Sequence, residues 1–169
     1  MKNKLIITIT IIALIVIGIL IFYNPFEKSN LENNTNNSKD KKDINFIELK
    51  KGSYNTITEK QERIVKSSAE WADLWTEMFP TEMIASAINF DERMVIAVFM
   101  GEKNTGGYSI MIDNIVEKDK NIDVLVKETY PGIGCAVIQV LTQPYYIVEL
   151  PKSDKEIKFV YGRETSNCG

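Results

Sequence analysis

The side chains that usually carry enzyme chemistry are scarce in this sequence. It contains no histidine, which excludes a Ser-His-Asp triad, a Cys-His dyad and every histidine-ligated zinc site. Its two cysteines, Cys135 and Cys168, are too few for a four-thiolate zinc site or a disulfide-dense scaffold. Cys135 has no histidine to activate it and no strong basic cluster beside it in the sequence, so a nucleophilic role is not expected. We therefore expect no catalytic residue, no metal site and no cofactor.

Carboxylates are the remaining source of catalysis, as in a glycosidase that uses two acids. Several acids are available, including Asp91, Glu92, Asp113 and Glu128. None lies in a sequence setting that indicates a raised pKa, so we expect them on the solvated surface. The net charge of −3 also argues against nucleic acid, which needs a concentrated basic surface. These observations favour a protein that is not an enzyme, has no small-molecule substrate and binds another protein.

The residues that could bind a partner lie in three loops. The first, residues 101–108, contains the pair Gly106-Gly107, which permits a positive φ and a close backbone approach. Turn geometry alone favours a simple hairpin here over a recognition loop. The second loop, residues 130–135, and the third, at Pro144, are stiffened by proline. The candidate contact residues are Asn104, Thr105, Gly106, Gly107, Tyr108, Pro131, Gly132, Ile133, Gly134, Pro144 and Tyr145.

One clear helix precedes these loops. Ser67 and Glu70 fit a capping box, and Pro80 is expected to end the helix. Behind the cap, four large apolar residues recur at i, i+3, i+4 and i+7, which places them on one helix face. They are Trp71, Leu74, Trp75 and Met78. The two tryptophans could form a platform for ligand stacking, but this spacing favours a role in the core.

The rest of the domain has the pattern of short strands. Residues 94–100 form a continuous apolar run, as expected for a strand buried on both faces, and Asn114 interrupts an alternating strand at an expected bulge. Gln139 lies in the apolar run 136–141, where a buried amide needs a partner and could bond to the Gly106-Gly107 loop. The expected strands are residues 46–49, 61–66, 94–100, 108–112, 122–130, 136–141, 145–150 and 157–161. The fold class predicted is α+β, mainly antiparallel sheet in a sandwich or half-barrel of about seven strands, with one main helix and a preceding N-terminal transmembrane helix.

The N-terminal residues have a different character. Residues 5–23 are almost wholly apolar, and a helix of this length rises about 28 Å, close to the thickness of a bilayer core. Lys2 and Lys4 precede the run, which predicts a cytoplasmic N-terminus and an extracytoplasmic remainder. A cleaved signal peptide and a buried core helix are the alternatives, and the absence of an A-x-A-like site favours an uncleaved anchor. The predicted organisation is an anchor at residues 1–23, a disordered Asn-rich tether at 24–45 and an extracytoplasmic domain at 46–169.

The two cysteines both fall in the predicted extracytoplasmic part, where a disulfide is permitted. A Cys135–Cys168 bridge would close a loop of about 32 residues and add about 3–4 kcal/mol in the chain-entropy model. Cys168 lies in a polar tail, however, and the sequence leaves both the paired and the unpaired state open.

Three motifs in this order resemble the C-terminal domain of the PrcB family, a protease-complex subunit. They are Asn104-Thr-Gly-Gly-Tyr108, Pro131-Gly-Ile-Gly-Cys135 and Gln139-Val-Leu-Thr-Gln-Pro144-Tyr145, followed by Val148-Glu-Leu-Pro151. The resemblance is greatest over residues 94–152. It implies an exported accessory protein that associates with or stabilises a surface protease and has no catalysis of its own.

The loop at Asn104–Tyr108 offers an alternative function. It is similar to the Asn-Pro-Thr-Thr-Gly-Tyr loop of chagasin-type cysteine-protease inhibitors, which also have a β-sandwich, although the proline and one threonine are missing here. The two functions to be separated are therefore an accessory subunit of a protease and a protease inhibitor.

Overall fold

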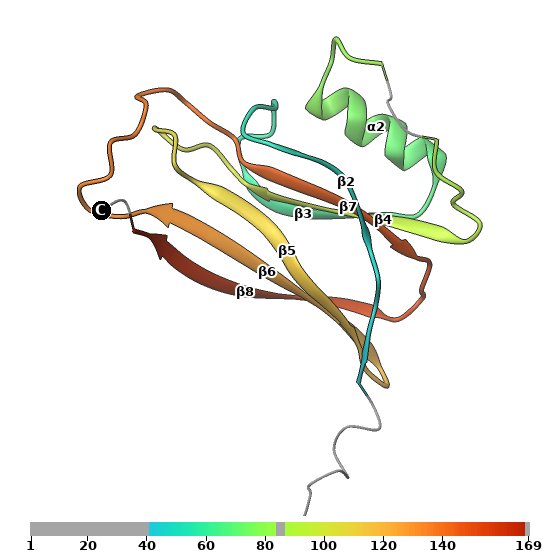
Figure 1. The fold of residues 1–169 in the computed structure, drawn as a ribbon. Helices are drawn as coiled ribbons and strands as arrows, with labels where there is room; N and C mark the ends of the chain where they lie inside the picture. The colour runs from blue at the N-terminus through green and yellow to red at the C-terminus, as the bar shows by residue number, and fades with distance from the viewer. Residues whose placement is uncertain (1–40, 84–86, 168–169) are drawn as a thin grey trace, which may run out of the picture. The chain divides into compact units, whose positions relative to one another are not determined.

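The computed structural model describes residues 41–83 and 87–167, which form two four-stranded sheets and one helix (Figure 1). Residues 40–169 form one compact unit. The predicted anchor at residues 1–23 lies outside the described residues, as does all but the last part of the tether. In the part of the chain that the structure describes, helical segments fall short of the length and hydrophobicity that a membrane span requires.

The described residues contain eight strands and one helix. In chain order they are β1 (Lys42–Asp43), β2 (Ile47–Gly52), β3 (Lys60–Val65), α2 (Ser68–Met78), β4 (Arg93–Met100), β5 (Ser109–Glu117), β6 (Asn121–Pro131), β7 (Tyr145–Pro151) and β8 (Glu156–Ser166).

The strands are divided between two sheets with the orders β1-β5-β6-β8 and β2-β7-β4-β3. Every pair is antiparallel except β6–β8, which is parallel. The two sheets pack face to face, and α2 covers the outer face of the second sheet (Figure 1). The prediction of a mainly antiparallel protein with one main helix is therefore confirmed.

Strand β4 explains the continuous apolar run in the sequence. Val95, Ala97 and Phe99 face α2, whereas the alternate residues of the same strand face the other sheet. Residues 94–100 are all buried, since a central strand between two cores needs apolar side chains on both faces. The expectation of a strand buried on both sides is correct.

Helix α2 begins and ends as the sequence predicts. The hydroxyl of Ser67 accepts a bond from the Glu70 amide at 3.3 Å, and the Glu70 carboxylate accepts from the Ser67 amide at 3.1 Å, which completes the capping box. Trp71, Leu74, Trp75 and Met78 are all buried. Edge-to-face contacts run from Trp71 through Trp75 and Phe79 to Tyr145, with centroids 5.1–5.6 Å apart. The tryptophans are core residues and not an exposed platform.

Two expectations about local structure are wrong. Residues 136–141 form an irregular segment, not a strand, because their backbone bonds to the loop before β5 at single points and not along a ladder. The loop at Gly106-Gly107 is not a hairpin, because it connects β4 of one sheet to β5 of the other. The expected bulge is present: the register of β5 against β6 shifts between Ile112 and Asn114.

Candidate binding rim

Two loops meet at one end of the sheet pair and form what we call the rim, residues 101–108 and 131–144. The backbones of Lys103 and Thr142 exchange two hydrogen bonds of 2.8 and 2.9 Å. The Gly106 amide donates to the Ile138 carbonyl at 2.9 Å, and the Thr142 hydroxyl donates to the Thr105 carbonyl at 2.9 Å. The sequence predicted residues 101–108 and 130–135 as candidate loops, whereas the contacts of the first loop are with Ile138 and Thr142, in and just after the segment predicted as a strand.

Two glycines allow this close approach. Gly107 has a φ of +84°, and a Cβ at this position would lie 2.8 Å from Val137 Cγ1 and 3.1 Å from Pro131 Cβ. A Cβ on Gly106 would lie 2.8 Å from Ile138 Cγ1. Any side chain at these positions would push the two loops apart, which is the physical reason for the Gly-Gly pair.

Aromatic side chains pack against each other at the base of the two rim loops, where these loops join β5 and β6. The rings of Tyr108 and Tyr130 meet edge to face at 5.5 Å, and the Arg163 guanidinium lies 3.6 Å from the Tyr130 ring centroid. The Tyr130 hydroxyl donates to Glu128 at 3.1 Å. Burial, and then the bond to Glu128, raise the pKa of Tyr130. Tyr108 is half-buried, so it contributes more to this support than to the exposed surface.

The second loop is also fixed to the end of β8. A Cβ on Gly132 would lie only 2.4 Å from the Ser166 carbonyl, so no larger residue fits this contact. The Ser166 hydroxyl donates to the Tyr130 carbonyl at 3.2 Å, and the Cys135 amide donates to the Gly132 carbonyl at 3.1 Å. Cys135 is disulfide-bonded in the structure. Its candidate partner Cys168 lies outside the described residues.

The rim carries several exposed apolar side chains. Ile133 is fully exposed, and Ile138, Leu141 and Val140 are 64%, 51% and 38% exposed. Gln139 is exposed and donates to the Val137 carbonyl at 3.2 Å, so it is not the buried amide expected from the sequence. A cluster of exposed apolar side chains on one short segment is typical of a protein contact surface.

The predicted contact residues separate into exposed and buried groups. Asn104, Gly107, Ile133 and Gly134 are exposed, and Thr105, Tyr108, Pro131 and Gly132 are partly buried. Gly106, Pro144 and Tyr145 are buried, with Tyr145 in the core beneath α2. These three residues hold the rim in place and do not form its surface. Sequence reasoning missed Ile138, Val140 and Leu141 because it assigned them to a strand. Gln139 was the signal against this assignment, since a buried strand would remove its amide from water.

The prediction that Glu128 lies on the solvated surface is wrong. Glu128 is only 5% exposed and faces the space between the sheets, whereas Asp91, Glu92 and Asp113 are exposed as expected. Its carboxylate lies 2.6 Å from the Lys60 ammonium, which in turn lies 3.9 Å from the Tyr161 ring centroid. This ion pair connects β6 to β3 across the two sheets. Within residues 41–83 and 87–167, no group of three or more acidic or sulfur ligands could hold a metal ion.

The rim lies at the opposite end of the β5–β6 hairpin from the entry of the chain. Lys42 of β1 pairs with Glu117 at the last residue of β5, whereas the rim loops precede Ser109 and follow Pro131. The length of β5 separates the two ends by roughly 27 Å. A domain held through its N-terminal side would therefore present the rim away from its point of attachment.

The fold and the rim define a β-protein of two packed sheets, with a helix on one outer face and an apolar loop surface at one end. Within it, residues 94–151 match the family model described as PrcB C-terminal. The match spans β4 to β7 with both rim loops, and it confirms the resemblance to the PrcB family. No curated protein and no solved structure matches the chain.

Proposed function

We propose that this protein is a membrane-anchored, non-enzymatic binding module that acts outside the cell membrane and associates with a protease complex through its rim. The family match supports a protein connected with a protease complex. The observation that carries the role of the rim is the set of exposed apolar side chains at Ile133, Ile138, Val140 and Leu141, all on the second rim loop. Close packing at Gly106 and Gly107 holds this loop against the first.

The position of the rim agrees with this proposal. The chain enters the domain at Lys42, at the far end of the β5–β6 hairpin from the rim. A predicted helix at residues 1–23 and a tether of about twenty residues would leave the rim free to meet a partner. The proposed location is thus the cell membrane, with a single pass, a cytoplasmic N-terminus and the domain on the outer side.

Two experiments test the location. Carbonate washing of membranes should leave the full chain in the pellet, and a protease added to intact cells should remove the domain. Release of the chain by carbonate, or protection of the domain until the cells are lysed, would contradict the proposed topology.

A peptidase assay tests the role. Native membranes with the wild-type chain should keep their surface peptidase activity longer at 37 °C than membranes with Ile138→Asp, because a charge in an apolar contact weakens association. Gln139→Asp, on the same segment but already polar and exposed, is the matched control and should behave like wild type. If the wild-type chain instead slows initial peptidase turnover and Ile138→Asp relieves that effect, the protein is an inhibitor, as the chagasin-like loop suggests. If the peptidase has the same lifetime and the same turnover in all three membranes, the proposed association with a protease is refuted.

A further inference from the structure

Strand β3 forms a free edge of its sheet. In the order β2-β7-β4-β3 it pairs only with β4, from Lys60 opposite Met100 to Val65 opposite Val95, and no described strand covers its other side. The register of this pair is continuous, whereas the opposite edge of the sheet, strand β2, has an irregularity between Glu48 and Lys50. A regular, uncovered edge leaves backbone donors and acceptors available to a further strand.

A groove runs along this edge beside the helix. It has a volume of about 240 Å³, and its lining residues are Arg63, Ile64, Val65, Glu70, Asp73, Leu74 and Glu77. Successive side chains of a strand point to opposite faces of the sheet. Because Arg63, Ile64 and Val65 are consecutive and all line the groove, the groove must follow the backbone edge of β3. The groove therefore has β3 on one side, α2 on the other and apolar atoms of Val65 and Leu74 within it.

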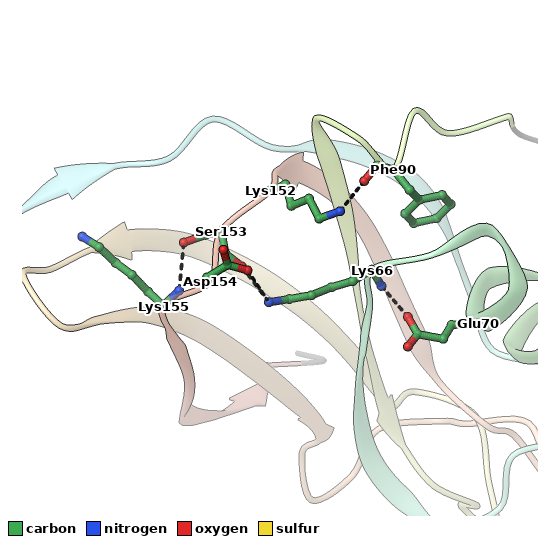
Figure 2. Close-up of polar contacts among 7 residues, drawn as sticks. All are labelled: Lys66, Glu70, Phe90, Lys152, Ser153, Asp154 and Lys155. Carbon is green, nitrogen blue, oxygen red and sulfur yellow. Dashed lines mark hydrogen bonds and ion pairs between the residues drawn. The ribbon is translucent and has the colours of Figure 1, made fainter.

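One end of the groove is held by the contacts of Lys66. The Lys66 amide donates to the Glu70 carboxylate at 2.7 Å, and the Lys66 ammonium donates to the Ser153 carbonyl at 2.7 Å and lies 3.6 Å from Asp154 (Figure 2). Beside this, the Lys152 ammonium donates to the Phe90 carbonyl at 2.6 Å (Figure 2). Because the Lys66 contacts fix the end of β3 and the start of α2 to the β7–β8 turn, this end of the edge needs little reordering to accept another strand.

The helix side of the groove is acidic. Glu70, Asp73 and Glu77 follow one another at i, i+3 and i+7, so they lie along the same face of α2. Glu77 lies 3.6 Å from Arg63, an exposed pair that leaves the lining with two excess negative charges. Hydrogen bonds from the Lys66 and Ser67 amides lower the pKa of Glu70, so this carboxylate is ionised at neutral pH. The groove thus favours positively charged side chains.

The other face of the edge carries one exposed apolar side chain, Ile64, in line with the charged residues Lys60 and Glu62, which are paired with Glu128 and Tyr161. Ile64 is directly opposite Ile96, which belongs to the core between the sheets, and Ile64 itself remains 40% exposed. A strand added to β3 would direct alternate side chains toward the acidic face of α2 and toward Ile64.

We propose that β3 and the groove beside α2 bind an extended segment of a protein partner, in which basic residues alternate with apolar ones, by adding that segment as a fifth strand to the sheet. The basic side chains would face Glu70, Asp73 and Glu77, and the apolar ones would cover Ile64. This surface is separate from the rim, so its occupancy does not depend on the function proposed for the rim.

The test uses residues 40–169, which form a compact unit with two cores of their own, and NMR titration with a defined probe. The probe is the acetylated and amidated hexapeptide Lys-Val-Lys-Val-Lys-Val, and its counterpart with glutamate in place of lysine is the negative control. Binding of the lysine peptide should shift the amides of residues 60–65 and 70–77 and slow hydrogen exchange along β3. No binding at millimolar peptide, equal binding of the glutamate peptide, or shifts elsewhere would overturn the proposal.

Three variants make the test specific. Asp73→Lys, which changes an exposed helix residue, should weaken binding about tenfold, because a charge facing the peptide is reversed. Asp119→Lys, at the exposed turn between β5 and β6, makes the same change in net charge and should leave the affinity unchanged. Equal weakening by both would show attraction by net charge alone and would refute the proposed groove. Ile138→Asp should bind the peptide like wild type, so that a failure here and a failure of the rim can be told apart.

Discussion

Gly107 provides the most direct test of how the rim is built. Replacing it with alanine places a side chain at a φ of +84°, a backbone conformation that costs an L-residue about 1–2 kcal/mol. The new Cβ would also lie 2.8 Å from Val137 Cγ1 and 3.1 Å from Pro131 Cβ, so one loop must move, at a cost of about 1 kcal/mol or more. Together these effects predict a loss of about 2–3 kcal/mol in the free energy of unfolding.

Gly134 supplies the matched control. Its φ of +89° is almost the same, but nothing lies within 4 Å of the Cβ that a substitution would add. Gly134→Ala should therefore cost only the conformational part, about 1–2 kcal/mol. Both variants can be compared by urea unfolding followed through the fluorescence of Trp71 and Trp75, which are buried on the inner face of α2. If Gly107→Ala is no less stable than Gly134→Ala, the contact between the two rim loops contributes nothing and the reasoning is refuted.

Three further predictions concern the core, the pH dependence and the cysteines. Lys60→Met should lower the free energy of unfolding by about 1–2 kcal/mol, because the buried Glu128 loses its counter-charge, whereas Lys158→Met, in an exposed pair, should stay within about 0.5 kcal/mol of wild type in the same urea titration. Burial raises the pKa of Tyr145 from 10.0 to about 12, so its contribution to stability is complete below pH 10 and is lost as the pH rises toward 12. Unfolding free energies measured between pH 9 and 12 should consequently fall less steeply for Tyr145→Phe than for wild type, and equal slopes would contradict this. Cys135 is disulfide-bonded, so the intact mass of the chain should rise by about 2 Da on reduction, with a loss of about 3–4 kcal/mol in stability; an unchanged mass would show two free thiols.

Local patterns made the helix and most strands predictable. The capping box at Ser67 and the spacing from Trp71 to Met78 depend only on residues within one turn or two, and the structure has both features as expected. The strand at residues 94–100 was predictable because a central strand with two covered faces needs an unbroken apolar run.

The parts that could not be predicted depend on contacts between distant residues. Residues 136–141 have the composition of a strand, but they lie beside a loop that crosses from one sheet to the other and find only isolated backbone partners there. Their apolar side chains are consequently exposed and not buried. Glu128 was predicted to be exposed because its partner, Lys60, lies far away in the sequence and no local pattern indicates the ion pair. The same limit applies to Pro144 and Tyr145, whose burial depends on α2 and β4.

The central claim is that the rim contacts a peptidase, and site-specific photo-crosslinking in native membranes tests it most directly. A photoreactive phenylalanine analogue replaces Ile138 on the rim in the full chain, and the same analogue replaces Asp119, on the exposed turn at the other end of the β5–β6 hairpin, as the control. Mass spectrometry then identifies the crosslinked protein. We expect a surface peptidase to be crosslinked from position 138 and not from position 119, and Gly107→Ala to reduce its yield. A peptidase captured equally from both positions, or a position-138 product that contains no peptidase, would contradict the claim.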